Sequence, residues 1–150
     1  MNDSEFEERL RQLHLLEQER LRIHGWIGRF VFETEEPPPG EHVLLNAYTV
    51  GIEESFGHLN FQIVLPLHQQ IINGIFHTLV DRLKEGVRFE DEMLSDKVLE
   101  GFDVEFMKTK TSRGEFLRVL IPDPKGLLPN DPLCDPPFKA QLNALRPAME

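Results

Sequence analysis

The sequence predicts an α+β fold, a mostly antiparallel sheet of five strands covered by one long helix. Five short stretches have strand patterns and most are joined by short turns, which favours antiparallel pairing. Residues 67–85 have the clearest helical periodicity of the chain. Prolines concentrate after residue 121, so residues 122–150 are expected to form an extended tail along the surface. Because 150 residues is a typical domain size, we expect residues 1–150 to form a single domain.

Residues 4–24 are expected to form an amphipathic helix ahead of the sheet. Ser4 and Glu7 have the spacing of a capping box, and Gly25 is the expected end of the helix. Its apolar face repeats at i, i+4, i+7 and i+10, with Phe6, Leu10, Leu13 and Leu16. Such a face can pack on the helix's own domain, or it can pair with a second copy of the chain in a homodimer. The pattern is compatible with both arrangements.

Three strands are expected in the first half of the chain, at residues 26–34, 42–52 and 59–66. A proline-rich loop at residues 35–41 and a turn at residues 53–58 separate them. The third strand has the period-2 pattern of a sheet with one buried face, with Leu59, Phe61, Ile63 and Leu65 alternating with Asn60, Gln62 and Val64.

The long helix predicted at residues 67–85 follows the third strand directly. Pro66 suits its first turn, and Gly86 is the expected stop. Its apolar residues recur with helical spacing at Ile71, Ile72, Ile75, Phe76, Leu79, Val80 and Leu83. We expect Ile75 and Phe76 to be buried against the sheet.

The last third of the chain is expected to add two strands, at residues 102–109 and 115–122, joined by a hairpin turn. The segment before them, residues 87–101, is acidic and irregular, with a helical turn near residues 96–100. Within the proline-rich tail, a final helical turn can be anchored by Phe138, Leu142 and Leu145.

The charge balance excludes some classes of partner. The chain has 16 Lys and Arg against 26 Asp and Glu, a net charge of −10. Binding to nucleic acid depends on cations that neutralise phosphates, so nucleic acid is not expected, whereas a basic protein partner is compatible with this charge. No apolar run approaches the roughly 20 residues of a membrane span, and the acidic N-terminus does not resemble a secretory or transit signal. With Cys134 as its single cysteine, we expect a cytoplasmic protein without a disulfide or membrane association.

Several short motifs are shared with one family. They are His24-Gly25-Trp26, Ala47-Tyr48-Thr49-Val50-Gly51-Ile52, Gly57-His58 before an apolar strand, Asn73 in the long helix, Pro122-Asp123 and Gly126. Together they resemble the bacterial family called domain of unknown function 4262, over roughly residues 24–138. The resemblance implies a bacterial source and supports the predicted architecture, and it brings no established activity. The helix at residues 4–24 lies outside it.

No recognised catalytic or metal-binding pattern is present in the sequence. The histidines lack the spacing of metal ligands, at His14, His24, His42, His58, His68 and His77. Cys134 stands beside Asp135, whose charge raises the pKa of a thiol, and Ser55 lacks the glycines of a nucleophile elbow. No glycine-rich loop opens a helix, so nucleotide binding by that route is not expected. We therefore expect no metal or other cofactor, and a protein without catalysis more readily than an enzyme.

The most site-like cluster is polar and lies on two predicted strands and the turn between them, with Asn46, Tyr48, Thr49, His58, Asn60 and Gln62. Asn46, Tyr48, Asn60 and Gln62 alternate on strands expected to pair, so they can share one face of the sheet. This face can simply be exposed to water, or it can form a shallow ligand site. Two acids in the intervening turn, Glu53 and Glu54, are further candidates for contacts with a partner.

We interpret the chain as a small bacterial protein without catalysis that binds a macromolecular partner. A basic protein is the expected partner, as for an immunity-like or regulatory protein, because acidic runs at residues 33–41, 53–54 and 90–92 would attract a cationic surface. The alternative is a small enzyme or small-molecule-binding protein that uses the polar face around Tyr48 and His58.

Overall fold

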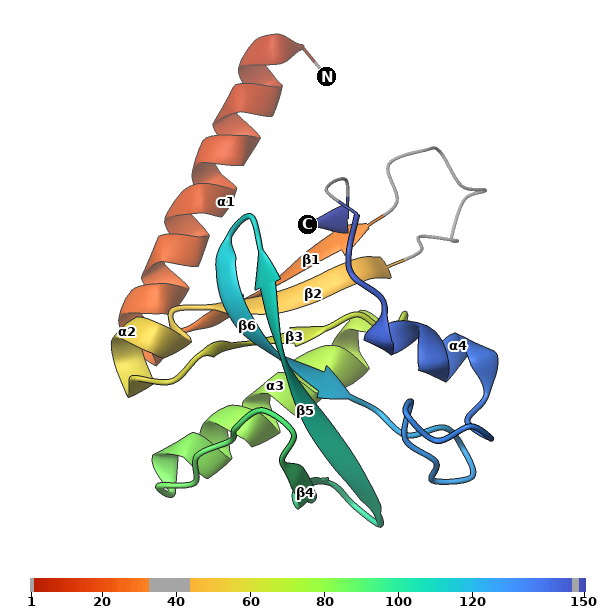
Figure 1. Ribbon diagram of the computed structural model, residues 1–150. Helices are drawn as coiled ribbons and strands as arrows, with labels where there is room; N and C mark the ends of the chain where they lie inside the picture. Colours follow the sequence, from red (N-terminus) through yellow and green to blue (C-terminus); the bar gives the residue numbers. More distant parts are fainter. Residues whose placement is uncertain (1, 33–43, 147–148) are drawn as a thin grey trace.

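The computed structural model describes residues 2–32, 44–146 and 149–150, which form a mixed sheet with helices around it (Figure 1). The helices are α1 (Asp3–His24), α2 (Ile52–Phe56), α3 (Gln69–Lys84) and α4 (Pro136–Lys139), the last followed by a 3-10 turn, η1 (Ala140–Leu142). The strands are β1 (Ile27–Phe32), β2 (Leu44–Val50), β3 (Asn60–Ile63), β4 (Leu94–Leu99), β5 (Phe102–Thr111) and β6 (Gly114–Leu120). Their order is β1-β2-β3-β6-β5-β4.

Two features of the sheet correct the prediction of five mostly antiparallel strands. In the described residues the sheet has six strands, and it is mixed because β3 and β6 pair in parallel. The additional strand, β4, lies where we expected irregular chain and a helical turn. It is an edge strand whose register shifts between Ser95 and Leu99, so it lacks a regular alternation of apolar residues. The parallel pair forms because the chain leaves β3, passes through α3, β4 and β5, and returns beside β3.

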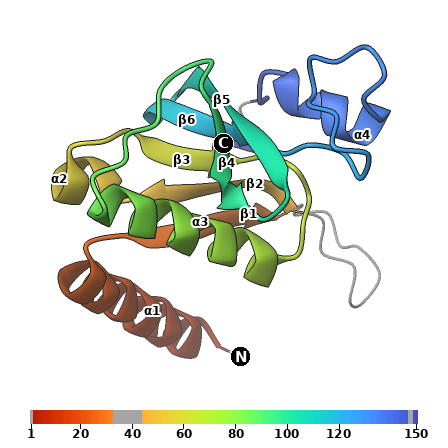
Figure 2. The ribbon, with the colours of Figure 1, turned by 90° about the horizontal axis from the view of Figure 1, so that it is seen from below.

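The α+β class and the long helix are confirmed. The helix predicted at residues 67–85 is α3, which lies along one face of the sheet (Figure 2). Ile75 and Phe76 are buried, as predicted. They pack in one core with residues from the facing strands, among them Ala47, Phe61, Ile63, Phe106 and Val119.

The strands of the first half are confirmed with shorter bounds. The strand predicted at residues 26–34 is β1, whose predicted last two residues lie outside the described residues, as does the loop predicted at residues 35–41. The strand predicted at residues 42–52 is β2, and it ends at Val50. There Gly51 has a φ of 99° and begins α2, where we expected only a turn.

The C-terminal part is not the extended tail predicted from its prolines. It folds back through α4 and η1, which supply the helical turn expected near Phe138 and Leu142. The side chain of Gln141 fixes this segment to the end of β6: its Nε2 donates to the Ile121 carbonyl at 2.8 Å, and its Oε1 accepts from the Ile121 N–H at 2.9 Å. Residues 140–146 are thereby held beside the face of the sheet opposite α3.

The predicted N-terminal helix is confirmed as α1, but its cap differs. Asn2, rather than Ser4, is the N-cap, and its Oδ1 accepts a hydrogen bond from the Glu5 N–H at 2.8 Å. None of the residues of α1 is buried. A 3.1 Å ion pair between Glu17 and Arg29 joins the helix to β1. Within the described ranges, no helix is both long enough and apolar enough to cross a membrane.

Candidate functional site

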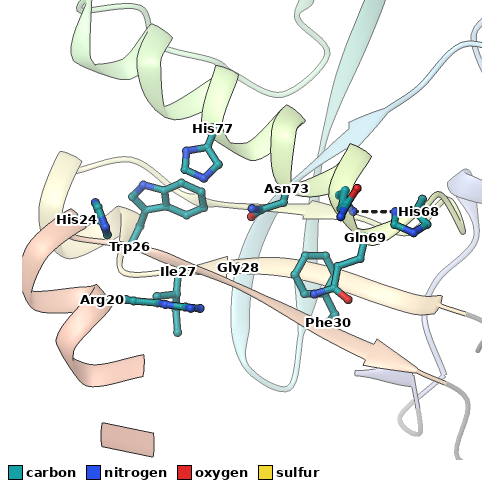
Figure 3. Close-up of a pocket in the computed structure, with 11 residues that line it drawn as sticks. Arg20, His24, Trp26, Ile27, Gly28, Phe30, His68, Gln69, Asn73 and His77 are labelled. Atoms are coloured by element: carbon teal, nitrogen blue, oxygen red, sulfur yellow. Dashed lines mark hydrogen bonds between the residues drawn. The ribbon is translucent and has the colours of Figure 1, made fainter. Parts of the chain in front are cut away.

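A cavity of about 640 Å³ lies between the C-terminal half of α1, β1 and the N-terminal half of α3 (Figure 3). We call it the α1–β1–α3 pocket, and it is lined by Arg20, His24, Trp26, Ile27, Gly28, Phe30, His68, Gln69, Gln70, Asn73 and His77. Its volume is in the range of sites that bind small molecules.

The wall formed by Trp26 depends on the junction between α1 and β1. Gly25 ends α1 with a φ of 79°, and its carbonyl oxygen accepts a 2.6 Å hydrogen bond from Ser55 Oγ on α2. Gly51 approaches so closely that a Cβ there would lie 2.5 Å from the same carbonyl oxygen. Contacts from α2 and from Gly51 before it therefore hold the junction between α1 and β1 in place. The Trp26 ring is held edge-to-face with His77 on α3, with 4.8 Å between the ring centroids.

α3 contributes its N-terminal cap and its first turns to the pocket. His68 is the N-cap residue, and its Nδ1 accepts from the Gln70 N–H at 3.1 Å. α3 packs over Gly28 of β1, and Asn73 Oδ1 lies 3.5 Å from where a Cβ of Gly28 would stand, an ordinary van der Waals contact. The amide of Asn73 therefore reaches the floor of the pocket over β1 (Figure 3).

The lining of the pocket is polar, and its one charged side chain is the guanidinium of Arg20, in a chain of net charge −10. Its described residues supply one guanidinium, three imidazoles and three amides, and no carboxylate. The N-terminus of α3 adds the positive end of a helix dipole, about half a charge. The side chains of Arg20, His24 and Asn73 make no hydrogen bond or ion pair with any described residue. Their polar groups are therefore available to a ligand, and the arrangement suits an anion.

The polar cluster predicted on β2 and β3 is only partly brought together. Tyr48 lies directly opposite Gln62, and Asn46 lies on the same face, as predicted. The interpretation that this face is exposed to water is wrong, because Asn46, Tyr48 and Gln62 are only 2%, 4% and 0% exposed. Residues 140–146 lie beside it, and the guanidinium of Arg113 stands 5.3 Å from the centre of the Tyr48 ring.

Thr49 and Asn60 form a hydrogen-bonded pair that links the end of β2 to β3 and to the start of α2. Thr49 Oγ1 donates to Asn60 Oδ1 at 3.0 Å and accepts from the Phe61 N–H at 2.9 Å. Asn60 Oδ1 also accepts from the Ile52 N–H at 3.1 Å, which satisfies a backbone donor at the start of α2. These contacts hold α2 against β3.

His58 is separated from Tyr48 by the sheet. Its ring packs on Phe61, with 5.0 Å between ring centroids, and Phe61 belongs to the core on the α3 side. Its ring nitrogens lie within hydrogen-bonding distance of the backbone of Leu59 and Phe89, at 2.8 Å and 3.1 Å. The structure therefore does not bring Tyr48 and His58 into one site.

Glu53 and Glu54 are exposed in the first turn of α2. This position is compatible with contacts to a partner, which stay a prediction. The acidic run at residues 33–41 falls outside the described residues. In the part of the chain that the structure describes, no group of three or more His, Cys, Asp or Glu residues could hold a metal ion.

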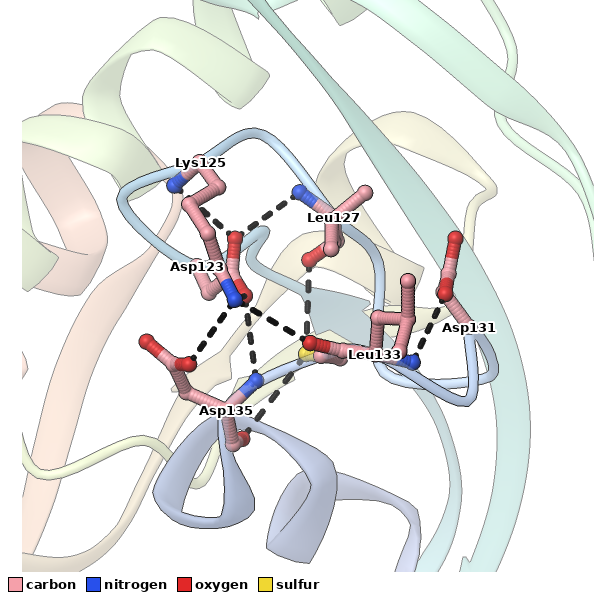
Figure 4. A network of polar contacts seen from close by, with 7 residues as sticks. Asp123, Lys125, Leu127, Asp131, Leu133 and Asp135 are labelled. Carbon is pink, nitrogen blue, oxygen red and sulfur yellow. Dashed lines mark hydrogen bonds and ion pairs between the residues drawn. The ribbon is translucent and has the colours of Figure 1, made fainter.

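A second polar network organises the loop after β6 (Figure 4). The buried carboxylate of Asp123 accepts hydrogen bonds from the N–H groups of Lys125 and Leu127 at 2.9 Å and of Asp135 at 3.0 Å. Burial raises the pKa of Asp123, but these bonds and the Lys125 charge outweigh it and hold the pKa below its usual value. Burial, together with the Asp123 and Asp135 charges, raises the pKa of Cys134. The Asp135 charge thus acts on this thiol in the direction expected from the sequence.

The pocket could not be predicted from the sequence because its walls come from separate segments. In the sequence, Trp26 and Asn73 stand out only through the family resemblance. Two signals could have drawn attention to them. One is a single Trp directly after a helix-ending glycine, and the other is the pair Asn73 and His77, one turn apart on the long helix.

The match to known families agrees with the resemblance. A family model with the description Domain of unknown function (DUF4262) matches residues 20–135. These residues include every residue that lines the α1–β1–α3 pocket, and they leave out most of α1. No curated protein and no solved structure matches the chain.

Proposed function

The chain belongs to the family Domain of unknown function (DUF4262), and we propose that this member is a binding protein that holds a small anionic molecule in the α1–β1–α3 pocket. The lining of the pocket carries this proposal. A cavity with Arg20, three histidines, three amides and no carboxylate among its described residues is unusual in so acidic a chain.

The ligand class follows from the two kinds of lining residue. Arg20 and His24 on α1, with the N-terminus of α3, offer donors to a phosphate or carboxylate group, and hydrogen bonds to a charged group contribute about 1.5–3 kcal/mol each. Trp26 and Phe30 offer aromatic surface to a planar ring. The ligand is therefore an oxyanion attached to a ring system.

Trp26 is the single tryptophan of the chain and lines the pocket, so its fluorescence reports binding directly. The experiment titrates phenyl phosphate, benzoate and adenosine monophosphate into the protein. Arg20→Gln should weaken the binding of responsive probes by about tenfold, since it removes a charged donor. Arg22→Gln is the matched control, because Arg22 lies on the same helix, pairs with Glu19 and is not among the lining residues. A flat response to all three probes, or equal effects of both variants, would reject the proposal.

A second function, association through α1, is favoured by a separate observation. The apolar face of this helix is exposed, at 55% for Phe6, 50% for Leu10, 58% for Leu13 and 48% for Leu16. Three of these positions have the 4-3 spacing of a coiled-coil seam. The first turn of α1 is acidic and the last turn is basic, so antiparallel pairing of two copies brings opposite charges together. We propose that a second copy of the chain covers this face. The basic protein partner expected from the acidic runs is a separate proposal, which would use the exposed Glu53 and Glu54 on α2.

Sedimentation equilibrium tests this association. The wild-type protein should form dimers, and Leu13→Glu should be monomeric because it places a charge in the paired face. Leu15→Glu is the matched control, since Leu15 is equally exposed on another side of α1 and its substitution should leave the dimer intact. A monomeric wild-type protein would contradict the pairing through α1.

A further inference from the structure

Gly28 lies within β1 at a position where the backbone does not require a glycine. It pairs with Thr49 in the regular ladder between β1 and β2, and it is not among the glycines with a positive φ. A glycine inside a strand weakens the strand, because it has no side chain to pack. Such a glycine often marks a place where a ligand or another backbone approaches closely.

The space above Gly28 is large enough for a methyl group. A Cβ on Gly28 would lie 3.4 Å from Phe76 Cδ2, 3.5 Å from Asn73 Oδ1 and 3.6 Å from Phe30 Cε2, which are ordinary van der Waals distances. The packing of α3 on β1 therefore tolerates an alanine here and does not explain the glycine. Gly28, Phe30 and Asn73 all line the α1–β1–α3 pocket and are only partly buried. We call the space between them the Gly28 recess.

The side-chain amide of Asn73 borders the Gly28 recess. It makes no hydrogen bond with a described residue, although Asn73 is partly buried. An amide presents an N–H donor and a carbonyl acceptor side by side in one plane. Its best partner is a flat edge with an acceptor and a donor on neighbouring positions, as in the pairing of Asn with N7 and the amino group of adenine. The recess and the amide together therefore suit the edge of a nitrogen heterocycle.

We propose that the ring of the ligand is a nitrogen heterocycle whose edge lies in the Gly28 recess and pairs with the amide of Asn73. This rests on the proposed function of the α1–β1–α3 pocket, and it distinguishes a base-like ring from a plain aromatic ring. Figure 3 shows Asn73 between Trp26 and Phe30, so the heterocycle lies over β1. The anionic group then points to Arg20 on α1. A nucleoside monophosphate has both parts.

Two nucleotides that differ at the ring edge test this pairing through Trp26 fluorescence. Adenosine monophosphate has the amino group, and purine riboside 5′-monophosphate lacks it. The wild-type protein should bind adenosine monophosphate about tenfold more tightly, because without the amino group the carbonyl of Asn73 stays unpaired. Asn73→Leu should bind the two nucleotides equally. Equal affinities in the wild-type protein, or an unchanged preference in Asn73→Leu, would overturn the proposal.

Gly28→Ala tests the recess itself, because it fills the space with a methyl group. It should weaken the binding of adenosine monophosphate by about tenfold, since the ring edge can no longer reach Asn73. Urea unfolding should show no loss of stability, because the Cβ fits. Gly74→Ala is the matched control: Gly74 lies on α3 with open space around it and does not line the pocket, so binding should be unchanged. Wild-type affinity in Gly28→Ala would overturn the proposal.

The failure of this proposal is distinguishable from the failure of the proposed function. If phenyl phosphate or benzoate binds and Arg20→Gln weakens that binding, the anion site stands. Equal binding of the two nucleotides, or no binding of either, would then reject only the heterocycle and its pairing with Asn73. A flat response to every probe would reject both proposals.

Discussion

Gly51 joins β2 to α2 with a φ of 99°, and a Cβ on it would lie 2.5 Å from the carbonyl oxygen of Gly25. Gly51→Ala should combine about 1–2 kcal/mol of backbone strain with displacement of the α1–β1 junction. Gly86→Ala is the matched control, because Gly86 has a φ of 91° but open space around it. Urea unfolding should show the larger loss for Gly51→Ala, and only that variant should change Trp26 fluorescence. Equal losses of unfolding free energy in the two variants would contradict the role of Gly51 in holding the α1–β1 junction.

Asp123 gives the folded protein a pH dependence. Its pKa is held below its usual value in the folded state, so the stability that it contributes is present above the unfolded pKa of about 3.9 and is lost as pH falls through the folded pKa. Asp123→Asn should therefore lower the free energy of unfolding at neutral pH, with a smaller loss under strongly acidic conditions. Asp103→Asn, at an exposed carboxylate, is the control. Urea unfolding at several pH values checks this, and a loss independent of pH would contradict the role of the charge.

At the level of single residues, local patterns predict burial better than hydrogen bonding. Ile75 and Phe76 are buried as their helical spacing indicates. The N-cap of α1 differs from the predicted Ser4. Asn2 accepts the hydrogen bond from the Glu5 N–H, and Ser4 is already inside the helix. Arg118 interrupts a nearly continuous apolar strand, and this was the one signal in the sequence that a charge is buried in the sheet.

Among the elements, α3 should contribute most through Phe76, whose ring is fully buried against the sheet. Phe76→Ala should lower the free energy of unfolding by about 3–5 kcal/mol, the usual range for a fully packed Phe. Ile71→Ala is the matched control on the exposed side of the same helix and should cost much less. Chemical denaturation measures both. A loss at Phe76 no larger than that at Ile71 would contradict the packing of α3.

The arrangement of elements was less predictable than their existence. The helices α1 and α3 and most strands follow from periodicity, which is a local property. β4 was missed because only Ser95 and Val98 of this edge strand are buried, so its residues do not alternate. The β3–β6 pairing and the return of the C-terminal segment depend on contacts between distant residues, such as Gln141 with Ile121. The α1–β1–α3 pocket depends on contacts of the same kind.

Over the whole molecule, the donor-rich lining of the α1–β1–α3 pocket, with Arg20 and no carboxylate among its described residues, contrasts with a net charge of −10. An acidic surface repels anions in general, so binding of an anion requires a local concentration of donors. The α1–β1–α3 pocket provides this with Arg20, His24 and the N-terminus of α3. The central claim is therefore that the negative charge of a ligand, and not its ring alone, determines binding there.

A matched pair of probes tests this claim most directly. Adenosine monophosphate and adenosine share the same ring system and differ by the phosphate group. Titration of each into the wild-type protein, followed through Trp26 fluorescence, compares their affinities at one ionic strength. The account predicts that the monophosphate binds at least about tenfold more tightly than the nucleoside, the difference expected from one charged hydrogen-bonding group. Equal affinities, or tighter binding of adenosine, would contradict it.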